Sequence, residues 1–297
     1  MFTVVALALG AAAVYGASDF FGAFAAKRIN VVTATLVNYA VATVGMLVPL
    51  AIVGGVWSWD AAWSGGLAGL LAVVGLLAFY AALAIGPMSL LSPLIALIES
   101  IVPIAVSVIT GQALSLVGWI AIGVAVVALL LLSPPPRPGR DRITATGAIL
   151  AVISGLLLGG ALIALDVAPH DSGVVPAFWE IVVGLVFLVI AWGLMRGIPL
   201  RGRALAFLEP TAETRGTITA RRAWIATVAS GLLVTAADAC IVMSLHLGNL
   251  AVVSVLVALY PVVTVILAAT LLKERMGKLQ IVAIVLVIVA SVMFSGS

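Results

Sequence analysis

The chain has 297 residues, of which 64% are hydrophobic and 8% are charged, and its mean hydropathy is +1.35. Such a composition cannot supply the polar surface of a soluble protein of this length. Its single cysteine, Cys240, excludes an internal disulfide framework and a cysteine metal cluster. The 14 basic residues lie in breaks between apolar stretches, which is typical of a protein in a lipid bilayer and gives no reason to expect a nucleic-acid partner.

Apolar stretches recur along the chain, and a helix needs about 20 such residues to cross the hydrocarbon core. The first has no basic residue before it and no clear cleavage site, so it is interpreted as a span rather than a secretory signal. Turn and charge breaks then predict ten transmembrane helices. Their ranges are 3–25, 32–54, 63–85, 89–110, 116–133, 144–166, 174–195, 223–246, 249–271 and 278–295.

All Lys and Arg residues fall on one side of this map. Basic residues near span ends mark the cytoplasmic side, so both termini are predicted to be non-cytoplasmic. We expect a multi-pass protein of a bacterial inner (plasma) membrane. The basic residues of the cytoplasmic loops are Lys27, Arg28, Arg137, Arg140, Arg142, Arg196, Arg201, Arg203, Arg215, Arg221, Arg222, Lys273, Arg275 and Lys278.

The chain resembles itself when it is shifted by 162 residues, from about 66–133 onto 228–295. Gly69 then falls on Gly231, and Gly86 on Gly248. Chance similarity between Ala/Leu/Val-rich helices is the alternative, but the glycine matches and the absence of gaps argue against it. Because each copy has five spans, the second copy must be inverted. Secondary transporters use such repeats around a central site.

The predicted fold is therefore an all-α membrane protein with ten helices in two inverted five-helix repeats around a central cavity. The first repeat is expected over residues 1–133, a cytoplasmic linker over 134–143, and the inverted second repeat over 144–297.

Four carboxylates lie well within the predicted spans: Asp19, Glu99, Glu180 and Asp238. No lysine or arginine is buried with them. An ionised carboxylate in hydrocarbon costs several kcal/mol, so each must face a polar cavity, be protonated, or pair with a cationic guest. Asp19 is expected in the inner third of the membrane, Glu99 near its middle, and Glu180 and Asp238 toward the outer side. This distribution predicts a route across the membrane.

Two prolines are predicted to act as hinges. Pro103 follows Glu99 by four residues and should free the Glu99 carbonyl, because proline lacks an N–H and crowds the carbonyl at i−4. Pro261 should do the same to the carbonyl of Val257. A carbonyl freed in mid-membrane is a candidate ion or substrate contact. Alternatively, the prolines only shape the bundle.

Other polar residues are candidates for the same pathway. Asn38 should lie at the depth of Asp19 and pair with it, although a structural cap is an equal alternative. Glu180, beside Trp179, either lines an outer vestibule or reaches the interface. All four tyrosines are intramembrane, where each hydroxyl needs a partner; we assign Tyr80 and Tyr260 to the pathway.

Catalytic signatures are missing from the sequence. It has no HExxH, GxSxG, Walker A or GxGxxG pattern, so neither an enzyme nor a cofactor is expected. His170 and His246 are predicted in outer loops, too far apart in sequence to predict a metal site. Without an ATP-binding module, uphill transport requires an ion gradient or exchange, and proton coupling is left open.

Over nearly its whole length the chain resembles EamA-type members of the drug/metabolite transporter superfamily. The resemblance rests on Tyr260-Pro261 through Leu272-Lys273-Glu274-Arg275-Met276-Gly277 and on the ten-helix pattern; the first half departs from it at Gly111-Gln112, where the family usually has an acid. It implies a basket of helices with a central cavity and export of amino acids, other small metabolites or drugs. Asp19 stands roughly where the smallest members carry a proton-coupling acid, but the local motif differs.

The first hypothesis is an exporter of amino acids or similar zwitterions that works by alternating access, with Glu99 and Asp238 meeting the ammonium group or a proton. The alternative is a proton-coupled exporter of lipophilic cations or drugs, since acids outnumber bases within the spans. An intramembrane enzyme would need a nucleophile or metal constellation, and a channel would not explain the repeat. The partners expected are a small-molecule substrate and lipid. The sequence does not fix the oligomeric state, and a monomer would suffice.

Overall fold

The computed structural model describes residues 1–26, 28–85, 88–112, 114–132, 144–197, 219–271 and 276–296. This part of the chain is helical, with one 3-10 turn. The elements are α1 (Phe2–Ala26), α2 (Val31–Gly45), α3 (Leu47–Ile52), α4 (Trp59–Ile85), α5 (Met88–Ile109), α6 (Leu116–Leu132), α7 (Ala145–Asp166), η1 (His170–Ser172), α8 (Val175–Gly197), α10 (Ala220–Leu247), α11 (Leu250–Val257), α12 (Tyr260–Leu271) and α13 (Lys278–Ser295).

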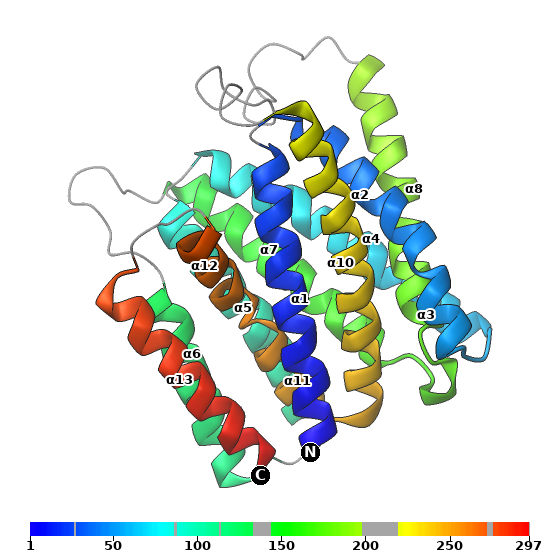
Figure 1. Cartoon of the computed structure of the whole chain (residues 1–297). Helices are drawn as coiled ribbons and strands as arrows, with labels where there is room; N and C mark the ends of the chain where they lie inside the picture. The colour runs from blue at the N-terminus through cyan, green and yellow to red at the C-terminus, as the bar shows by residue number, and fades with distance from the viewer. Residues whose placement is uncertain are drawn as a thin grey trace.

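The ten predicted spans correspond to these helices. The helices α2 and α3 share one span, and α11 and α12 share another. Eight spans are long and apolar enough to cross a membrane, and the apolar segments Leu94–Ile109 and Leu116–Leu132 are shorter. Both termini lie at the same end of the bundle, as an even number of crossings requires (Figure 1). We call this the termini end and the other the opposite end. The predicted linker, 134–143, lies outside the described residues.

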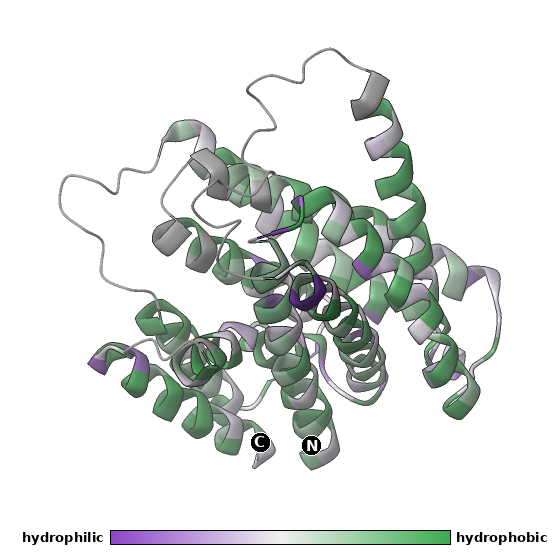
Figure 2. Ribbon diagram, turned by 45° about the horizontal axis from the view of Figure 1, so that its top comes forward, coloured by the Kyte–Doolittle hydropathy of each residue, from purple (hydrophilic) through white to green (hydrophobic). Residues whose placement is uncertain are grey.

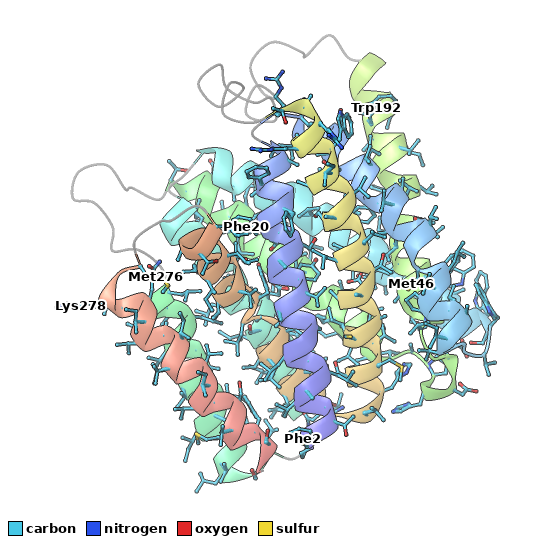
Figure 3. The ribbon with its side chains drawn as sticks, viewed as in Figure 1. Phe2, Phe20, Met46, Trp192, Met276 and Lys278 are labelled. Carbon is cyan, nitrogen blue, oxygen red and sulfur yellow. The ribbon has the colours of Figure 1, made fainter. Side chains whose placement is uncertain are left out.

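The outer surface of the bundle is apolar. Hydrophobic residues cover the helices in Figure 2, and large side chains such as Ile52, Leu116 and Ile288 are exposed. Such a surface is costly in water but not in lipid, where the backbone must satisfy its own hydrogen bonds, as helices do. The described basic side chains are Arg28, Arg221, Arg222 and Lys278, and all are exposed at the opposite end, where Figure 3 labels Lys278. This placement agrees with the one-sided charge pattern.

The helices pack as two groups of four and one pair. The first bundle consists of α1, α2, α10 and α12, in which α1 and α10 form the most extensive contact. The second bundle consists of α4, α5, α7 and α8, in which α4 contacts α7 and α8, and α5 contacts α7. The helices α6 and α13 pack against each other (Figure 1). Each bundle therefore combines helices from both halves of the chain.

Glycines set the closest helix crossings. A Cβ at Gly69 in α4 would overlap the backbone carbonyl of Glu180 in α8, and one at Gly231 in α10 would lie within 3.0 Å of the carbonyl of Asn38 in α2. Small residues of this kind let helix backbones approach closely in membranes. The crossings place Glu180 and Asn38 at fixed depths in the two bundles.

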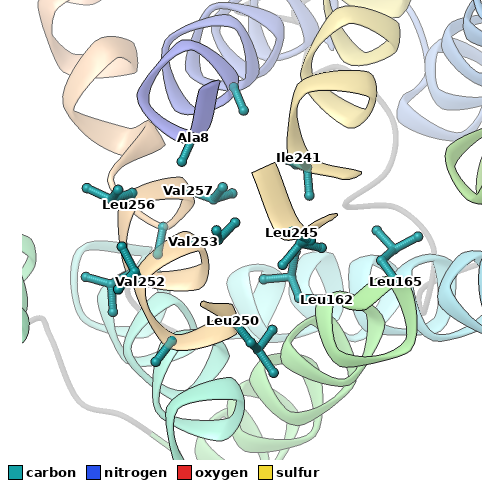
Figure 4. Close-up of a cluster of buried hydrophobic side chains, with 14 of the residues drawn as sticks. Ala8, Leu162, Leu165, Ile241, Leu245, Leu250, Val252, Val253, Leu256 and Val257 are labelled. Carbon is teal, nitrogen blue, oxygen red and sulfur yellow. The ribbon is translucent and has the colours of Figure 1, made fainter. Parts of the chain in front are cut away.

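An apolar cluster joins the bundles near the termini end. Every residue of α11 is buried. Figure 4 shows Leu250 and Val253 of α11 beside Leu245 of α10 and Leu162 of α7. Because α7 belongs to the second bundle and α10 to the first, this cluster closes the space between the bundles at this depth.

Loops at the termini end are also tied together by hydrogen bonds. The Val56 N–H donates to the Asp171 carbonyl at 2.9 Å, which links the α3–α4 loop to η1. The Ser107 hydroxyl lies 3.0 Å from Oδ1 of Asn249 and 2.9 Å from Oε1 of Gln112. These contacts join α5 and the α5–α6 loop to the start of α11, so the termini end is held by polar as well as apolar contacts.

Candidate functional site

The four acids predicted within the membrane come from four helices, two in each bundle. Asp19 lies in α1 and Asp238 in α10, both of the first bundle. Glu99 lies in α5 and Glu180 in α8, both of the second bundle. The described lysine and arginine side chains are all exposed at the opposite end.

Tyr15 of α1 is the residue that connects the acids. Its hydroxyl interacts electrostatically with Asp238, Asp19, Tyr39 and Glu99. Asp19 also acts electrostatically on Glu99, which belongs to the other bundle. The structure therefore gathers the acids that the sequence distributes over 220 residues into one group, which we call the acid cluster.

The second pair within the acid cluster is Glu180 and Asp238, which interact with each other. Asp238 is 7% exposed. Glu180 is partly buried, and its Oε2 atom is buried without a hydrogen-bond partner; Oε2 of Glu99 is in the same state. Buried acceptors without partners are rare in proteins, and those at functional sites often await a ligand or a proton.

Access to the acid cluster differs among its members. Asp19 is exposed although it lies deep in α1 and interacts with Glu99 of the other bundle. Asp238, by contrast, is buried.

The predicted break at Pro261 is present. Helix α11 ends at Val257, and α12 begins at Tyr260. The rings of Tyr260 and Tyr15 lie 5.6 Å apart at 57°. The interruption therefore falls beside the acid cluster, where it presents the N-terminus of α12.

Helix α5 remains helical through Pro103. Because proline has no N–H, the Glu99 carbonyl lacks the donor that a helix normally provides four residues later. The same carbonyl lies against Gly159 of α7, where an added Cβ would be 2.8 Å away. The role of Pro103 as a hinge stays a prediction.

Asn38 is part of a hydrogen-bond network rather than the expected pair with Asp19. Its amide donates to Ser230 of α10 at 2.7 Å. The Ser230 hydroxyl lies 3.0 Å from the Ser18 hydroxyl and 2.9 Å from the Ser18 carbonyl in α1. The network joins α1, α2 and α10 next to Asp19, and Asp19 itself remains accessible.

The remaining predicted site residues lie apart from this network. Trp179 packs in an aromatic group with Trp57 and Phe178, with ring centroids 6.3 and 5.8 Å from its own. Trp57 is largely exposed, as is typical of a residue at the membrane interface. The side chain of Tyr80 lies outside the described part of the structure.

His170 and His246 meet although they are far apart in sequence. Their rings stack with centroids 5.5 Å apart and planes at 24°. His246 is in the last turn of α10, not in a loop as predicted. The described residues contain no group of three or more potential metal ligands. The pair therefore acts as a contact between α10 and η1 at the termini end.

The sequence does not single out Tyr15 and Tyr39 as neighbours of the acids. The Tyr39 ring of α2 contacts Gly184 of α8, so it crosses from the first bundle to the second. Both were recognised as intramembrane tyrosines, but choosing among four tyrosines required knowing which helix faces meet.

The fold and the acid cluster define a polytopic helical membrane protein whose intramembrane acids come from both helix bundles. The family model for the EamA-like transporter family matches residues 145–296. The chain belongs to this family, which is part of the drug/metabolite transporter superfamily.

Comparison with solved structures supports the same fold. One structure, titled "Crystal structure of protein", aligns with 97% of this chain and 95% of its own, with a TM-score of 0.72 at 15% sequence identity. At this identity the likeness shows the fold alone. A search of curated protein sequences found no match.

Proposed function

We propose that this protein is a secondary transporter that exports amino acids or similar small zwitterions by alternating access. The observation that carries the proposal is the acid cluster, to which each bundle contributes two carboxyls. A site shared in this way changes its access when the bundles move relative to each other.

The helix contacts support two inverted repeats, 1–133 and 144–297, as the basis of this movement. By order along the chain, the counterparts of α1, α2 and α4 are α7, α8 and α10. When each helix is exchanged for its counterpart, the α1–α10 contact becomes the α7–α4 contact, and the α2–α10 contact becomes the α8–α4 contact. The pair α6–α13 is exchanged with itself. The family match over 145–296 coincides with the proposed second repeat.

The closed termini end supports one state of an alternating cycle. The apolar cluster around α11 and the loop hydrogen bonds occupy that end, whereas Asp19 is exposed and lies in the part of α1 nearer the opposite end. If the basic residues of the opposite end face the cytoplasm, this state would take up substrate from the cytoplasm, as an exporter requires.

A zwitterion finds complementary groups here. Its ammonium would meet Asp19 and Glu99, whose Oε2 lacks a partner. Its carboxylate would lie near the N-terminus of α12, where the helix dipole carries partial positive charge. Tyr15 and Tyr260 would enclose the substrate between these two ends.

The test is uptake of labelled amino acids into proteoliposomes, with and without a proton gradient. Glu99→Gln should lower uptake roughly 10- to 100-fold, because one charge-assisted hydrogen bond is lost. Asp60→Asn, which changes an exposed acid at the start of α4, serves as the control and should leave uptake unchanged. Wild-type uptake equal to that of empty liposomes would reject amino acids as substrates.

The second candidate is a proton-coupled exporter of lipophilic cations. It is favoured by the excess of acids over described bases at the site and by the neighbouring tyrosine rings, which can hold a cation over their faces. Binding of quaternary ammonium compounds in place of amino acids would support it.

A further inference from the structure

The two histidines of the chain come from different bundles and meet at the termini end. His246 lies in the last turn of α10, which belongs to the first bundle. His170 begins η1, which connects α7 with α8 of the second bundle. Their rings stack with centroids 5.5 Å apart and planes at 24°. This contact, which we call the histidine stack, therefore joins the two bundles.

The loop that carries His170 is held by its backbone. The Val56 N–H donates to the Asp171 carbonyl at 2.9 Å, and the Val174 N–H donates to the Gly54 carbonyl at 3.2 Å. Both bonds tie η1 and its C-terminal flank to the loop that leads into α4 of the second bundle. His170 therefore keeps its place relative to the second bundle.

His246 adjoins the apolar cluster that closes the space between the bundles. It follows Leu245 of α10, which lies beside Leu162 of α7 (Figure 4). His246 is half-buried, whereas His170 is exposed, so water reaches one side of the histidine stack. A movement that separates the bundles at this depth must also separate the two rings.

The histidine stack tolerates neutral rings better than charged ones. The Nε2 atom of His246 is buried without a hydrogen-bond partner. A protonated imidazole carries an N–H at both ring nitrogens, so the N–H at this atom would have no acceptor. A buried donor without an acceptor is unfavourable, and two charged rings at this separation also repel each other. Separating the rings relieves both effects, because water then reaches the nitrogen.

Two acids lie near the histidine stack, both on the side of His170. Asp166 ends α7 and acts electrostatically on His170, and Asp171 of η1 acts on His246. Asp171 attracts a charged His246 and so favours contact between the rings. It is exposed, so water and salt weaken this attraction, whereas the Nε2 atom of His246 is buried. The described lysine and arginine side chains lie at the opposite end.

We propose that the histidine stack is a proton-sensitive gate. It holds the termini end closed while the rings are neutral and releases it when they are protonated, which histidines do between about pH 8 and pH 5. This inference rests on the proposed function, in which the termini end opens during the transport cycle. Opening itself is measured without a substrate.

The test measures the distance between spin labels on the two bundles by double electron–electron resonance in lipid nanodiscs. The labels are attached at Ile109→Cys in α5 and Leu247→Cys in α10, two exposed positions at the termini end, in a Cys240→Ser background. A longer distance should appear at acid pH. The ratio of the longer to the shorter distance should rise at least about fivefold from pH 8 to pH 5.

Two variants separate the proton from the ring contact. His170→Phe and His246→Phe each keep an aromatic ring in the histidine stack but cannot take up a proton. Both should stay closed, with a change of less than about twofold over the same pH range. A wild-type distance that does not depend on pH, or an equal change in the phenylalanine variants, would overturn the gate.

Asp171→Asn tests the opposing charge. It removes the attraction for a protonated His246, so the longer distance should be more populated at pH 5 than in wild type. Loss of the pH response in this variant would show that Asp171, and not the histidine stack, is the switch, and the proposal would be wrong.

Amino-acid exchange in proteoliposomes tests the proposed function separately. If wild type exchanges no amino acid, the proposed function fails, while the distance measurement still decides whether protons open the termini end. If exchange is intact and the distance does not depend on pH, the gate alone is rejected.

Discussion

Two helix crossings in this protein are built alike but carry different polar groups. In the α4–α8 crossing, Gly69 lies against the backbone of Glu180, and in the α10–α2 crossing, Gly231 lies against the backbone of Asn38. The glycines are 162 residues apart, the same shift that aligns the two halves of the sequence. The helix packing is thus repeated, while the residue presented by the partner helix is not.

The difference lies in how each side chain is satisfied. The amide of Asn38 donates to Ser230, which also contacts Ser18. Oε2 of Glu180 is buried and has no partner. The crossing of α2 with α10 therefore pairs its polar side chain, whereas that of α4 with α8 leaves a buried acceptor without a partner. On the proposed function, the two crossings position these residues in the same way, and the residue that differs between them takes part in the chemistry.

The largest expected effect on stability comes from adding a Cβ at the glycine of either crossing. Gly69→Ala and Gly231→Ala should each lower the free energy of unfolding by about 1–3 kcal/mol, because the new Cβ would press on a backbone carbonyl that cannot move by itself. Unfolding in mixed detergent micelles, followed by tryptophan fluorescence, measures this loss.

Gly123→Ala in α6 is the matched control, since no atom outside its helix lies within 4 Å of a Cβ there. It should be neutral or stabilising by up to about 1 kcal/mol, because alanine favours a helix more than glycine does. If only one of the two crossing variants destabilised the protein more than this control, the crossings would not be equivalent.

Much of the frame could be predicted from the sequence. Hydropathy located ten spans, because a segment in lipid must be long and apolar, and the 162-residue shift selected Gly69 and Gly231, which turned out to be contact points. The cost of a charge in hydrocarbon selected the four acids. These inferences depend only on the membrane and on the composition of single segments.

Partners across the bundle could not be predicted in the same way. The donor–acceptor pair Asn38–Ser230 is separated by 192 residues, and it depends on how far α2 is rotated toward α10. For the same reason the sequence did not show that His170 stacks on His246, or that Tyr15 lies among the acids. Hydropathy patterns identify an apolar span but do not identify which face of it meets which neighbour.

A smaller effect is expected when the hydrogen-bond network around Asn38 is broken at its centre. Ser230→Ala leaves the Asn38 amide without its partner and removes the contacts of the Ser230 hydroxyl with Ser18, although the Ser18 hydroxyl can still donate to the Ser230 carbonyl. The free energy of unfolding should fall by about 1–2 kcal/mol, since buried donors would lose their acceptor. The same detergent unfolding measurement applies. If the free energy of unfolding changed no more than in Gly123→Ala, water would replace the hydroxyl, and the crossing would be accessible to water.

The smallest effect is expected from Asn38→Ala, and it decides whether the two crossings differ in function. Ser230 keeps its contacts with Ser18 in this variant, so only one hydrogen bond is lost. The free energy of unfolding should therefore fall by about 0.5–1.5 kcal/mol. Amino-acid uptake, corrected for the amount of folded protein, should stay within about twofold of wild type, because no ligand is expected at a satisfied amide. Uptake reduced as strongly as in Glu99→Gln would place Asn38 on the transport pathway, as the sequence had predicted, and both crossings would then carry function.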